Sequence, residues 1–251
     1  MNSDHEIPMH PIPAADVDPR SNALLCSITA SEWCRWSIYL EPVKLSFGQV
    51  LSEPGRASAY VYFPTTAIVS LVYMTEDGAS SELAVIGHEG IVGISQFMGG
   101  DTMPYQAMVQ GAGLGFRLRA QVVSDEMQRG GALMQRLLLY AQTLMNQVAQ
   151  TAACNRYYSI DQLLCRRLLL ALDRMPSGVL LMTQELLASL LGVRREGVTA
   201  AALRLQASGA IRYSRGRIDV LDRAQLSVQA LDRPLTGRQN GKPSMGHALP
   251  V

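Results

Sequence analysis

The sequence predicts an α+β protein with three parts: a β-rich N-terminal domain, one long central helix, and a C-terminal helical unit that ends in a β-hairpin. Three observations support this prediction. Short β-type runs separated by turn residues fill much of the first half. A continuous helical pattern follows them. The C-terminal part then holds two short amphipathic helices around a glycine, and two short strands come after them.

The N-terminal half has the pattern of a many-stranded β-domain. Residues 21–40 carry apolar residues at helical spacing and are expected to form one or two short helices. Between residues 43 and 116, β-type runs alternate with turn signals such as Glu76-Asp77-Gly78. Many short strands at near-regular spacing predict a jelly roll, a double-stranded β-helix. The expected strands are Lys44–Phe47, Tyr60–Phe63, Ala67–Met74, Ser81–Ile86, Ala107–Gln110 and Leu114–Arg117.

A single long helix is expected over residues 120–156. One set of side chains recurs along it at spacings of four, three, four and three, which is the period of a coiled-coil seam. We therefore predict that this helix joins two copies of the chain in a homodimer. The alternative is that the same set packs the helix against its own domain. The set consists of Leu137, Ala141, Leu144, Val148 and Thr151.

The C-terminal part predicts a winged helix-turn-helix. An amphipathic helix over residues 159–175 comes first. Thr183 is a favourable N-cap for the next helix, Gly192 closes it, and another helix runs from Arg194 to Gln206. Two short strands then flank Ser214-Arg215-Gly216-Arg217 and form the hairpin, or wing.

The start of the second helix carries side chains suited to reading base pairs. In a helix-turn-helix, this helix enters the major groove of DNA. Arginine can donate two hydrogen bonds to guanine, and glutamate can accept one from cytosine. Arginines at the hairpin tip suit contacts with backbone phosphates. The predicted DNA-binding residues are Thr183, Arg194, Arg195, Glu196, Thr199, Arg215 and Arg217.

Charge is divided unevenly between the two halves. Residues 1–125 hold 6 basic and 13 acidic side chains, a net charge of −7. Residues 126–251 hold 16 basic and 8 acidic side chains, a net charge of +8. An acidic half joined to a basic half favours a polyanionic partner for the second half, although a chance distribution of solvated charges gives the same numbers.

The segment from Thr183 to Val198 resembles the DNA-binding signature of the cyclic-AMP receptor protein/fumarate–nitrate regulator (Crp/Fnr) superfamily. The Arg-Glu pair of that signature matches Arg195 and Glu196. The resemblance extends from about Leu24 to Leu226. It implies a cyclic-nucleotide-binding-type sensor barrel and a homodimeric transcription regulator. The implied target is double-stranded DNA with an inverted repeat, and RNA polymerase is a candidate further partner.

Two departures from the family pattern bear on specificity. The basic residue that usually follows the Glu by one turn is Ala200 here, so the operator is expected to differ from the familiar half-site. In the sensor, Ile94 stands where cyclic-nucleotide binders have a carboxylate for the ribose. Pro104-Tyr105 stands where they have the Arg-Ser pair for the phosphate. Because a cyclic phosphate needs a compensating charge or a ring of donors, we expect no cyclic AMP binding of the usual kind.

The effector is therefore unassigned, and two alternatives stay open. One is a DNA-binding regulator without any small-molecule effector, controlled by its abundance or by a partner protein. The other is a cupin-type metal enzyme, which needs two or three histidines and a carboxylate around a metal. His88 is the one histidine within the predicted barrel. We accordingly expect a protein that is not an enzyme and that has no metal and no cofactor.

Neither a signal-peptide pattern nor an apolar run of about 18 residues occurs, so a cytoplasmic protein without a membrane partner is expected. The cysteines are expected to be ordinary buried thiols: Cys26, Cys34, Cys154 and Cys165.

The expected domain organisation follows the changes in composition. The predicted parts are a disordered tail (1–20), the jelly-roll sensor (21–119), the dimerisation helix (120–156), the winged helix-turn-helix (157–231) and a second disordered tail (232–251).

Overall fold

The computed structural model describes residues 17–100, 102–175 and 179–231. The predicted disordered tails therefore lie outside the described residues, apart from residues 17–20. There the prediction is wrong. Pro19–Ser21 form a 3-10 turn (η2), and the Arg20 guanidinium lies over the Trp33 ring at 4.7 Å from its centroid. A cation held over an aromatic face fixes this segment against the following helices.

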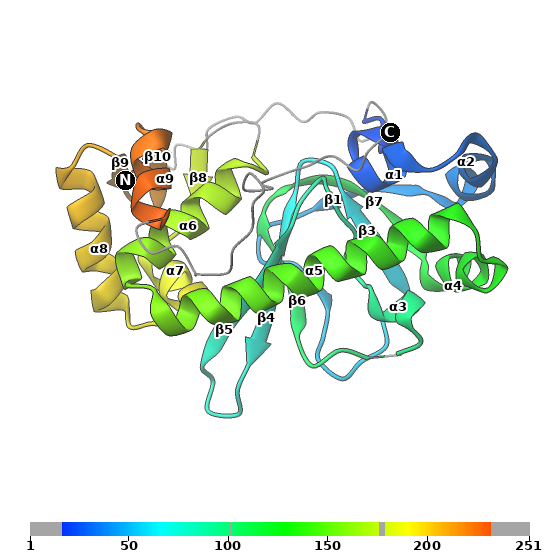
Figure 1. Ribbon diagram of the computed structural model, residues 1–251, viewed down its shortest axis with the longest axis horizontal. Coiled ribbons are helices and arrows are strands. Elements are labelled where there is room, and N and C mark those ends of the chain that lie inside the picture. The colour runs from blue at the N-terminus through cyan, green and yellow to red at the C-terminus, as the bar shows by residue number, and fades with distance from the viewer. Residues whose placement is uncertain (1–16, 101, 176–178, 232–251) are drawn as a thin grey trace, which may run out of the picture.

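The N-terminal part begins with two short helices and continues as a β-domain (Figure 1). Helix α1 covers Ala23–Ser27, α2 covers Ala30–Trp36, and a 3-10 turn (η3) covers Ser37–Tyr39. The helices are the expected pair. The strands that follow are β1 Glu41–Leu45, β2 Val50–Ser52, β3 Tyr60–Pro64, β4 Ile68–Met74, β5 Ser80–Ile86, β6 Gln106–Gly111 and β7 Gly113–Arg119, with a short helix α3 (Ser95–Met98) between β5 and β6.

Two antiparallel sheets enclose the core of this β-domain. One has the strand order β1-β7-β3 and the other the order β2-β6-β4-β5. All six expected runs overlap strands, whereas the three-residue strand β2 was not predicted. Apolar side chains from both sheets meet in one buried cluster, in which Trp36 and Phe63 are in edge-to-face contact at 5.9 Å. Side chains that point into this core alternate along the strands with side chains that point outward, as in sandwiches of the jelly-roll type.

The central helical region is two helices, so the prediction of one continuous helix is wrong. Helix α4 (Ala120–Arg129) ends at Gly130, and α5 (Ala132–Tyr157) starts after Gly131. The φ angles of these glycines are +74° and +98°, which only glycine adopts readily. The Gly-Gly pair therefore stops one helix and lets the next begin in a new direction.

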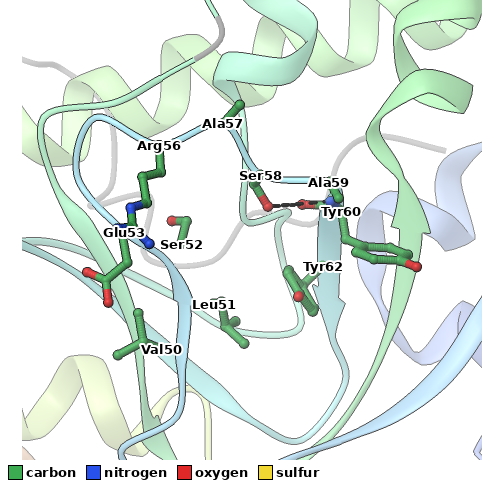
Figure 2. A pocket seen from close by; sticks show the side chains of 10 residues that line it. All are labelled: Val50, Leu51, Ser52, Glu53, Arg56, Ala57, Ser58, Ala59, Tyr60 and Tyr62. Atoms are coloured by element: carbon green, nitrogen blue, oxygen red, sulfur yellow. Dashed lines mark hydrogen bonds between the residues drawn. The ribbon is translucent and has the colours of Figure 1, made fainter.

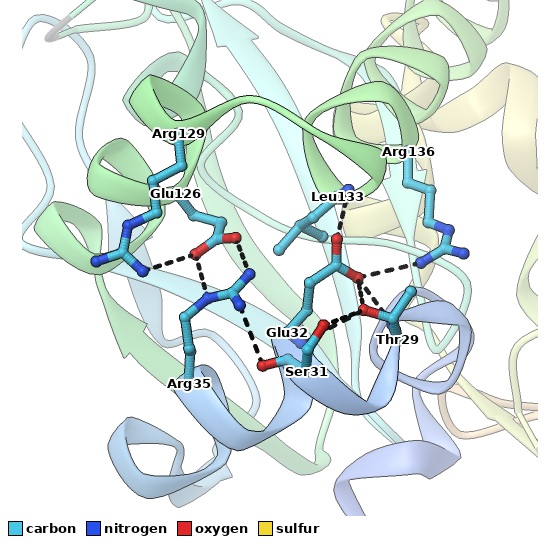
Figure 3. A network of polar contacts seen from close by, with 8 residues as sticks. All are labelled: Thr29, Ser31, Glu32, Arg35, Glu126, Arg129, Leu133 and Arg136. Atoms are coloured by element: carbon cyan, nitrogen blue, oxygen red, sulfur yellow. Dashed lines mark hydrogen bonds and ion pairs between the residues drawn. The ribbon is translucent and has the colours of Figure 1, made fainter.

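A network of carboxylates and arginines fixes the start of α5 to the N-terminal helices (Figure 3). The Glu32 carboxylate accepts hydrogen bonds of 2.8 Å from the backbone N–H groups of Thr29 and Leu133. Glu32 therefore completes the capping box of α2 and also satisfies a free N–H in the first turn of α5. Beside it, the guanidinium of Arg35 donates to both carboxylate oxygens of the buried Glu126 on α4. These contacts tie α2, α4 and α5 into one unit.

The C-terminal domain is built around a second hydrophobic cluster. Helix α6 (Ile160–Leu172) begins with a capping box at Ser159 and contributes Leu164, Cys165 and Leu168 to this cluster. The remaining elements are β8 Val179–Leu181, α7 Gln184–Leu191, α8 Arg195–Ala207, β9 Ile211–Ser214, β10 Arg217–Val220 and α9 Arg223–Leu231. The three strands form a small antiparallel sheet in the order β8-β10-β9. Among the described helices, none combines the length and apolar character that a membrane span requires.

Candidate DNA-binding interface

The turn between α7 and α8 has the geometry of a helix-turn-helix. The Thr183 hydroxyl caps α7 by accepting a hydrogen bond of 3.1 Å from the Leu186 N–H. Gly192 ends α7 in the left-handed conformation, with φ at +65°. The Val193 N–H then donates to the Ala188 carbonyl at 3.1 Å, which closes a tight C-cap. The sequence predicted the roles of Thr183 and Gly192.

Helix α8 buries one face and exposes the other. Val198, Ala201, Ala202 and Leu205 are buried against α6 and α7. The first-turn side chains are exposed: Arg194, Arg195 and Glu196. The small alanines allow close helix contact, so the start of α8 projects outward with three polar side chains that can donate to and accept from base edges.

The wing is a hairpin with a two-residue turn at Arg215-Gly216. Ser214 pairs with Arg217 across the turn. Both turn residues have positive φ, +49° for Arg215 and +77° for Gly216, which is the requirement of a type I′ hairpin turn. This conformation leaves Arg215 exposed at the tip, as expected. The Arg217 guanidinium instead forms an ion pair of 3.0 Å with Asp219 on its own strand.

An open groove of about 570 Å³ lies between the start of α7, the start of α8 and the wing. Three groups give it its chemistry. The first-turn N–H groups of α7 place a partial positive charge there, and the groove is also lined by Arg195 of α8 and Arg215 of the wing. The lining residues are Thr183, Gln184, Glu185, Arg195, Tyr213, Ser214, Arg215 and Gly216.

Five of these lining residues were not among the predicted DNA-binding residues: Gln184, Glu185, Tyr213, Ser214 and Gly216. Glu185 matters most, because its carboxylate lies 3.5 Å from the guanidinium of Arg195. Both side chains are well exposed, so this ion pair holds Arg195 weakly. Their spacing of ten residues across a turn carries no pattern that single-sequence reasoning could use.

Thr199 lies between the two helices rather than at the exposed surface. Its Oγ1 is 2.7 Å from Oε1 of Gln184 and 3.0 Å from the carbonyl oxygen of Arg195, and the side chain is half-buried. The hydroxyl therefore already has acceptors inside the protein. Its position links the starts of α7 and α8 and so helps to hold Arg195 at the groove.

The predicted dimer seam is wrong for most of its members. Leu137, Ala141 and Leu144 are 0%, 3% and 4% exposed, and they belong to the barrel core. Val148 is half-buried against the same core. These side chains face the chain's own barrel because α5 packs along it, so the three buried ones have no surface to offer to a second copy. Thr151 is half-buried, and its hydroxyl donates to the Gln147 carbonyl.

The sensor stretch that departs from cyclic-nucleotide binders is largely buried. Ile94 is 6% exposed and belongs to the barrel core, and Tyr105 packs against that core. Burial raises the pKa of Tyr105 to about 12. His88 lies half-buried in the turn after β5. Neither Ile94 nor Tyr105 supplies a charge for a phosphate at neutral pH.

A separate cavity of about 310 Å³ lies under the loop between β2 and β3 (Figure 2). Glu53 and Arg56 give it both charges, and the phenol ring of Tyr62 closes one side. The Glu53 carboxylate also accepts a hydrogen bond of 3.0 Å from the Gln106 amide on β6. The full lining is Val50, Leu51, Ser52, Glu53, Arg56, Ala57, Ser58, Ala59, Tyr60 and Tyr62.

The cysteines only partly match the expectation of buried thiols. Cys154 and Cys165 are buried, and burial raises the pKa of Cys165 to about 12. Cys26 and Cys34 are exposed, which corrects the prediction, because both lie on solvent-facing turns of short helices. Within the described ranges, no group of three His, Cys, Asp or Glu side chains is placed to hold a metal ion.

A β-barrel joined by a long helix to a winged helix-turn-helix defines a class of DNA-binding regulators. Comparisons with known proteins agree. Residues 163–228 match the family model of the Crp-like helix-turn-helix domain. No match was found among curated proteins.

Solved structures share the fold of nearly the whole described chain. A Crp/Fnr-family putative transcriptional regulator from Eubacterium rectale is 16% identical, with a TM-score of 0.66 over 82% of this chain and 97% of its own. A Crp/Fnr-family regulator from Thermus thermophilus is 22% identical, with a TM-score of 0.61 over 76% and 98% of the two chains.

The c-di-GMP-responsive regulator CLP from Xanthomonas campestris is 16% identical, with a TM-score of 0.61 over 77% of this chain and 100% of its own. The C-terminal domain of the chain is thus a Crp-like helix-turn-helix domain. The chain as a whole has the fold of the Crp/Fnr transcription regulators.

Proposed function

We propose that this protein is a sequence-specific transcription regulator that binds an inverted repeat in double-stranded DNA as a homodimer. The observation that carries the proposal is the exposed Arg195-Glu196 pair at the start of α8, beside a groove that ends at Arg215 of the wing. Arg195 and Glu196 can reach base edges, while the groove and Arg215 suit a phosphate of the backbone. RNA polymerase is a candidate further partner, and the proposed role is cytoplasmic and non-catalytic.

The homodimer forms, in this proposal, through the solvent-facing side of α5. Residues on that side recur at spacings of four, three, four and three, one position away from the buried set. Leu138 and Met145 are 46% and 63% exposed, a large apolar exposure for one helix. The alanines in the series allow close approach of a second helix. The proposed seam is Leu138, Gln142, Met145, Ala149 and Ala152.

The sensor barrel, we infer, does not bind cyclic AMP in the usual way. The buried Ile94 and the partly buried Tyr105 at the family's ligand positions support this. Calorimetry with cyclic AMP should show no saturable binding at micromolar concentration. A screen of metabolites by thermal melting tests whether any effector exists, because a ligand of the folded state raises the melting temperature by mass action. No shift with any compound would favour regulation by abundance or by a partner protein.

Selection from random duplex DNA tests the central proposal. The wild type should enrich an inverted repeat with half-sites about 34 Å apart, centre to centre. Arg195→Ala should lose discrimination at one base pair of each half-site, worth about 1–3 kcal/mol. Arg56→Ala, which removes an exposed arginine of the barrel, is the matched control and should select the same motif. A motif unchanged by Arg195→Ala would show that Arg195 does not read a base. Failure to enrich any motif, in buffer or in cell extract, would overturn the proposed function.

A further inference from the structure

The outer face of the four-stranded sheet is buried, although it points away from the barrel core. Residues directly opposite each other in antiparallel strands point to the same face. Val72 on β4 lies opposite both Glu82 on β5 and Gln106 on β6. The next residue, Leu71, belongs to the barrel core, so Val72 and Glu82 point outward. Both are nevertheless buried, because other parts of the chain cover them.

The covering elements are α5 and the DNA-binding domain. Gln147 on α5 donates a hydrogen bond of 3.2 Å to the Val85 carbonyl. From the DNA-binding domain, Arg167 on α6 places its Nε 2.9 Å from Oε1 of Glu82. The Ser70 hydroxyl donates to the other carboxylate oxygen at 2.5 Å. Glu82 thus has one partner on its own sheet, Ser70, and one in the DNA-binding domain, Arg167.

Two further contacts lie around this pair. Arg174, just beyond the end of α6, forms an ion pair of 2.6 Å with Glu89 in the turn after β5. At α7, the hydroxyl oxygens of Ser189 and of Ser80 on β5 are 2.6 Å apart. These contacts are more exposed than the central pair, in which the Arg167 and Glu82 side chains are only 2% and 8% exposed. The centre of the domain contact is therefore a buried ion pair within a polar rim.

The energetics of this pair argue against a role in stability alone. A guanidinium has five N–H donors, yet Nη1 and Nη2 of Arg167 are buried without a hydrogen-bond partner among the described residues. Burial also raises the pKa of Glu82 even though Arg167 and Ser70 act to lower it. The cost of removing both charges from water is therefore only partly offset. A hydrophobic pair at the same place would hold the domains together at least as well, but it would not impose one relative orientation.

Arg167 is well placed to transmit that orientation to the recognition helix. It lies in the middle of α6, and α6 contacts α8 closely: a Cβ added to Gly197 would lie 2.5 Å from Cδ1 of Ile160. The Arg204 guanidinium of α8 donates two hydrogen bonds, of 2.9 and 2.8 Å, to the Asp161 carboxylate of α6. A rotation of α6 on the barrel therefore moves α8 with it.

We propose that the buried Glu82–Arg167 ion pair is the positioning contact through which the sensor barrel sets the orientation of α8, and with it the half-site spacing that the dimer accepts. This inference rests on the proposed DNA-binding function. In a dimer joined through α5, the separation of the two α8 helices depends on how each DNA-binding domain sits on its barrel. The pair fixes that placement to one geometry.

The test is selection from a DNA library in which the two half-sites are separated by a spacer of random length, using the full-length protein. The wild type should favour one spacing. The double variant Glu82→Leu/Arg167→Met removes both charges and keeps an apolar contact, so its melting temperature should be unchanged or higher. It should accept several spacings, and its preference for the wild-type spacing over neighbouring ones should fall about tenfold.

The control variant Glu41→Gln/Arg117→Met removes an ion pair of 2.7 Å on the far sheet of the barrel and should leave the spacing preference intact. If the double variant does not fold, Ser70→Ala is used, which removes only the hydroxyl donor to Glu82 and should broaden the preference to a smaller extent. An unchanged spacing preference in a folded variant that still selects the half-site would overturn this inference and leave the proposed function intact. Failure of the wild type to select any half-site would overturn both.

Discussion

Truncation of the exposed apolar side chains on α5 should separate the dimer without unfolding the protomer. The variant is Leu138→Ala/Met145→Ala. Burying a whole leucine or methionine side chain stabilises an association by about 2 kcal/mol. With 46% and 63% of these side chains exposed in the single chain, each can contribute about 1 kcal/mol when a second copy covers it. Two protomers supply four such side chains, so the variant should lose about 4 kcal/mol, which is about a thousandfold in the dimer dissociation constant.

Sedimentation equilibrium over a range of concentrations measures that constant directly. The matched control is Met74→Ala/Leu181→Ala, because these side chains have comparable exposure, 48% and 64%, but lie on the β4–β5 hairpin and on β8. The control should dimerise like the wild type, and both variants should melt at nearly the wild-type temperature. A dissociation constant that is unchanged in the α5 variant, or that rises equally in the control, would refute the proposal that this side of α5 forms the dimer interface.

Three further predictions concern the protomer and its DNA contact. Leu137→Ala should cost about 2–5 kcal/mol in the free energy of unfolding, measured by urea denaturation, because it leaves a cavity in the barrel core instead of loosening a dimer. The hydrogen bonds from Thr29 and Leu133 outweigh burial and hold the pKa of Glu32 below its usual 4.5. The ionised Glu32 carboxylate therefore stabilises the folded protein above pH 4.5, and this contribution is lost as the pH falls through the lowered pKa. Glu32→Gln should therefore be less stable than the wild type at neutral pH and should converge with it in acid, whereas the exposed Asp125→Asn should match the wild type throughout. Arg215→Ala should weaken binding to every duplex alike, and a plot of log affinity against log salt should become shallower by about one, whereas a change in sequence preference would contradict a phosphate contact.

The sequence predicted the C-terminal domain well because its signals are local. Thr183 as a cap, Gly192 as a helix stop and the Arg215-Gly216 turn each depend on backbone rules that act within a few residues. The exposed Arg195-Glu196 pair follows from the same rules, since the register of α8 is fixed at its N-terminus. The ion pair of Arg195 with Glu185 could not be predicted, because it depends on how two helices cross.

The sequence failed where a periodic pattern has two physical solutions. The set that starts at Leu137 and the set that starts at Leu138 have the same heptad spacing and differ by one residue, which is about 100° around a helix. Both sets contain apolar side chains, so both faces of α5 could pack against a partner. Periodicity alone cannot say which face meets the barrel and which meets a second chain. Packing determines which face meets the barrel. Tyr140 lies on the same side of α5 as Leu137 and Leu144, and its hydroxyl donates a hydrogen bond of 3.1 Å to the Ile91 carbonyl of the barrel.

That packing gives the protomer a continuous chain of contacts from the barrel to the helix-turn-helix. Glu32 and Arg136 anchor the start of α5 on the N-terminal helices, and Gln147 holds its middle on β5. The same strand, β5, carries Glu82, so α5 and the DNA-binding domain are both attached to one strand. We expect a shift of this strand, whether caused by a ligand, a partner or DNA itself, to alter both attachments together. The proposed coupling needs no charge at the family's usual phosphate position, so it is compatible with the buried Ile94 and the partly buried Tyr105 there.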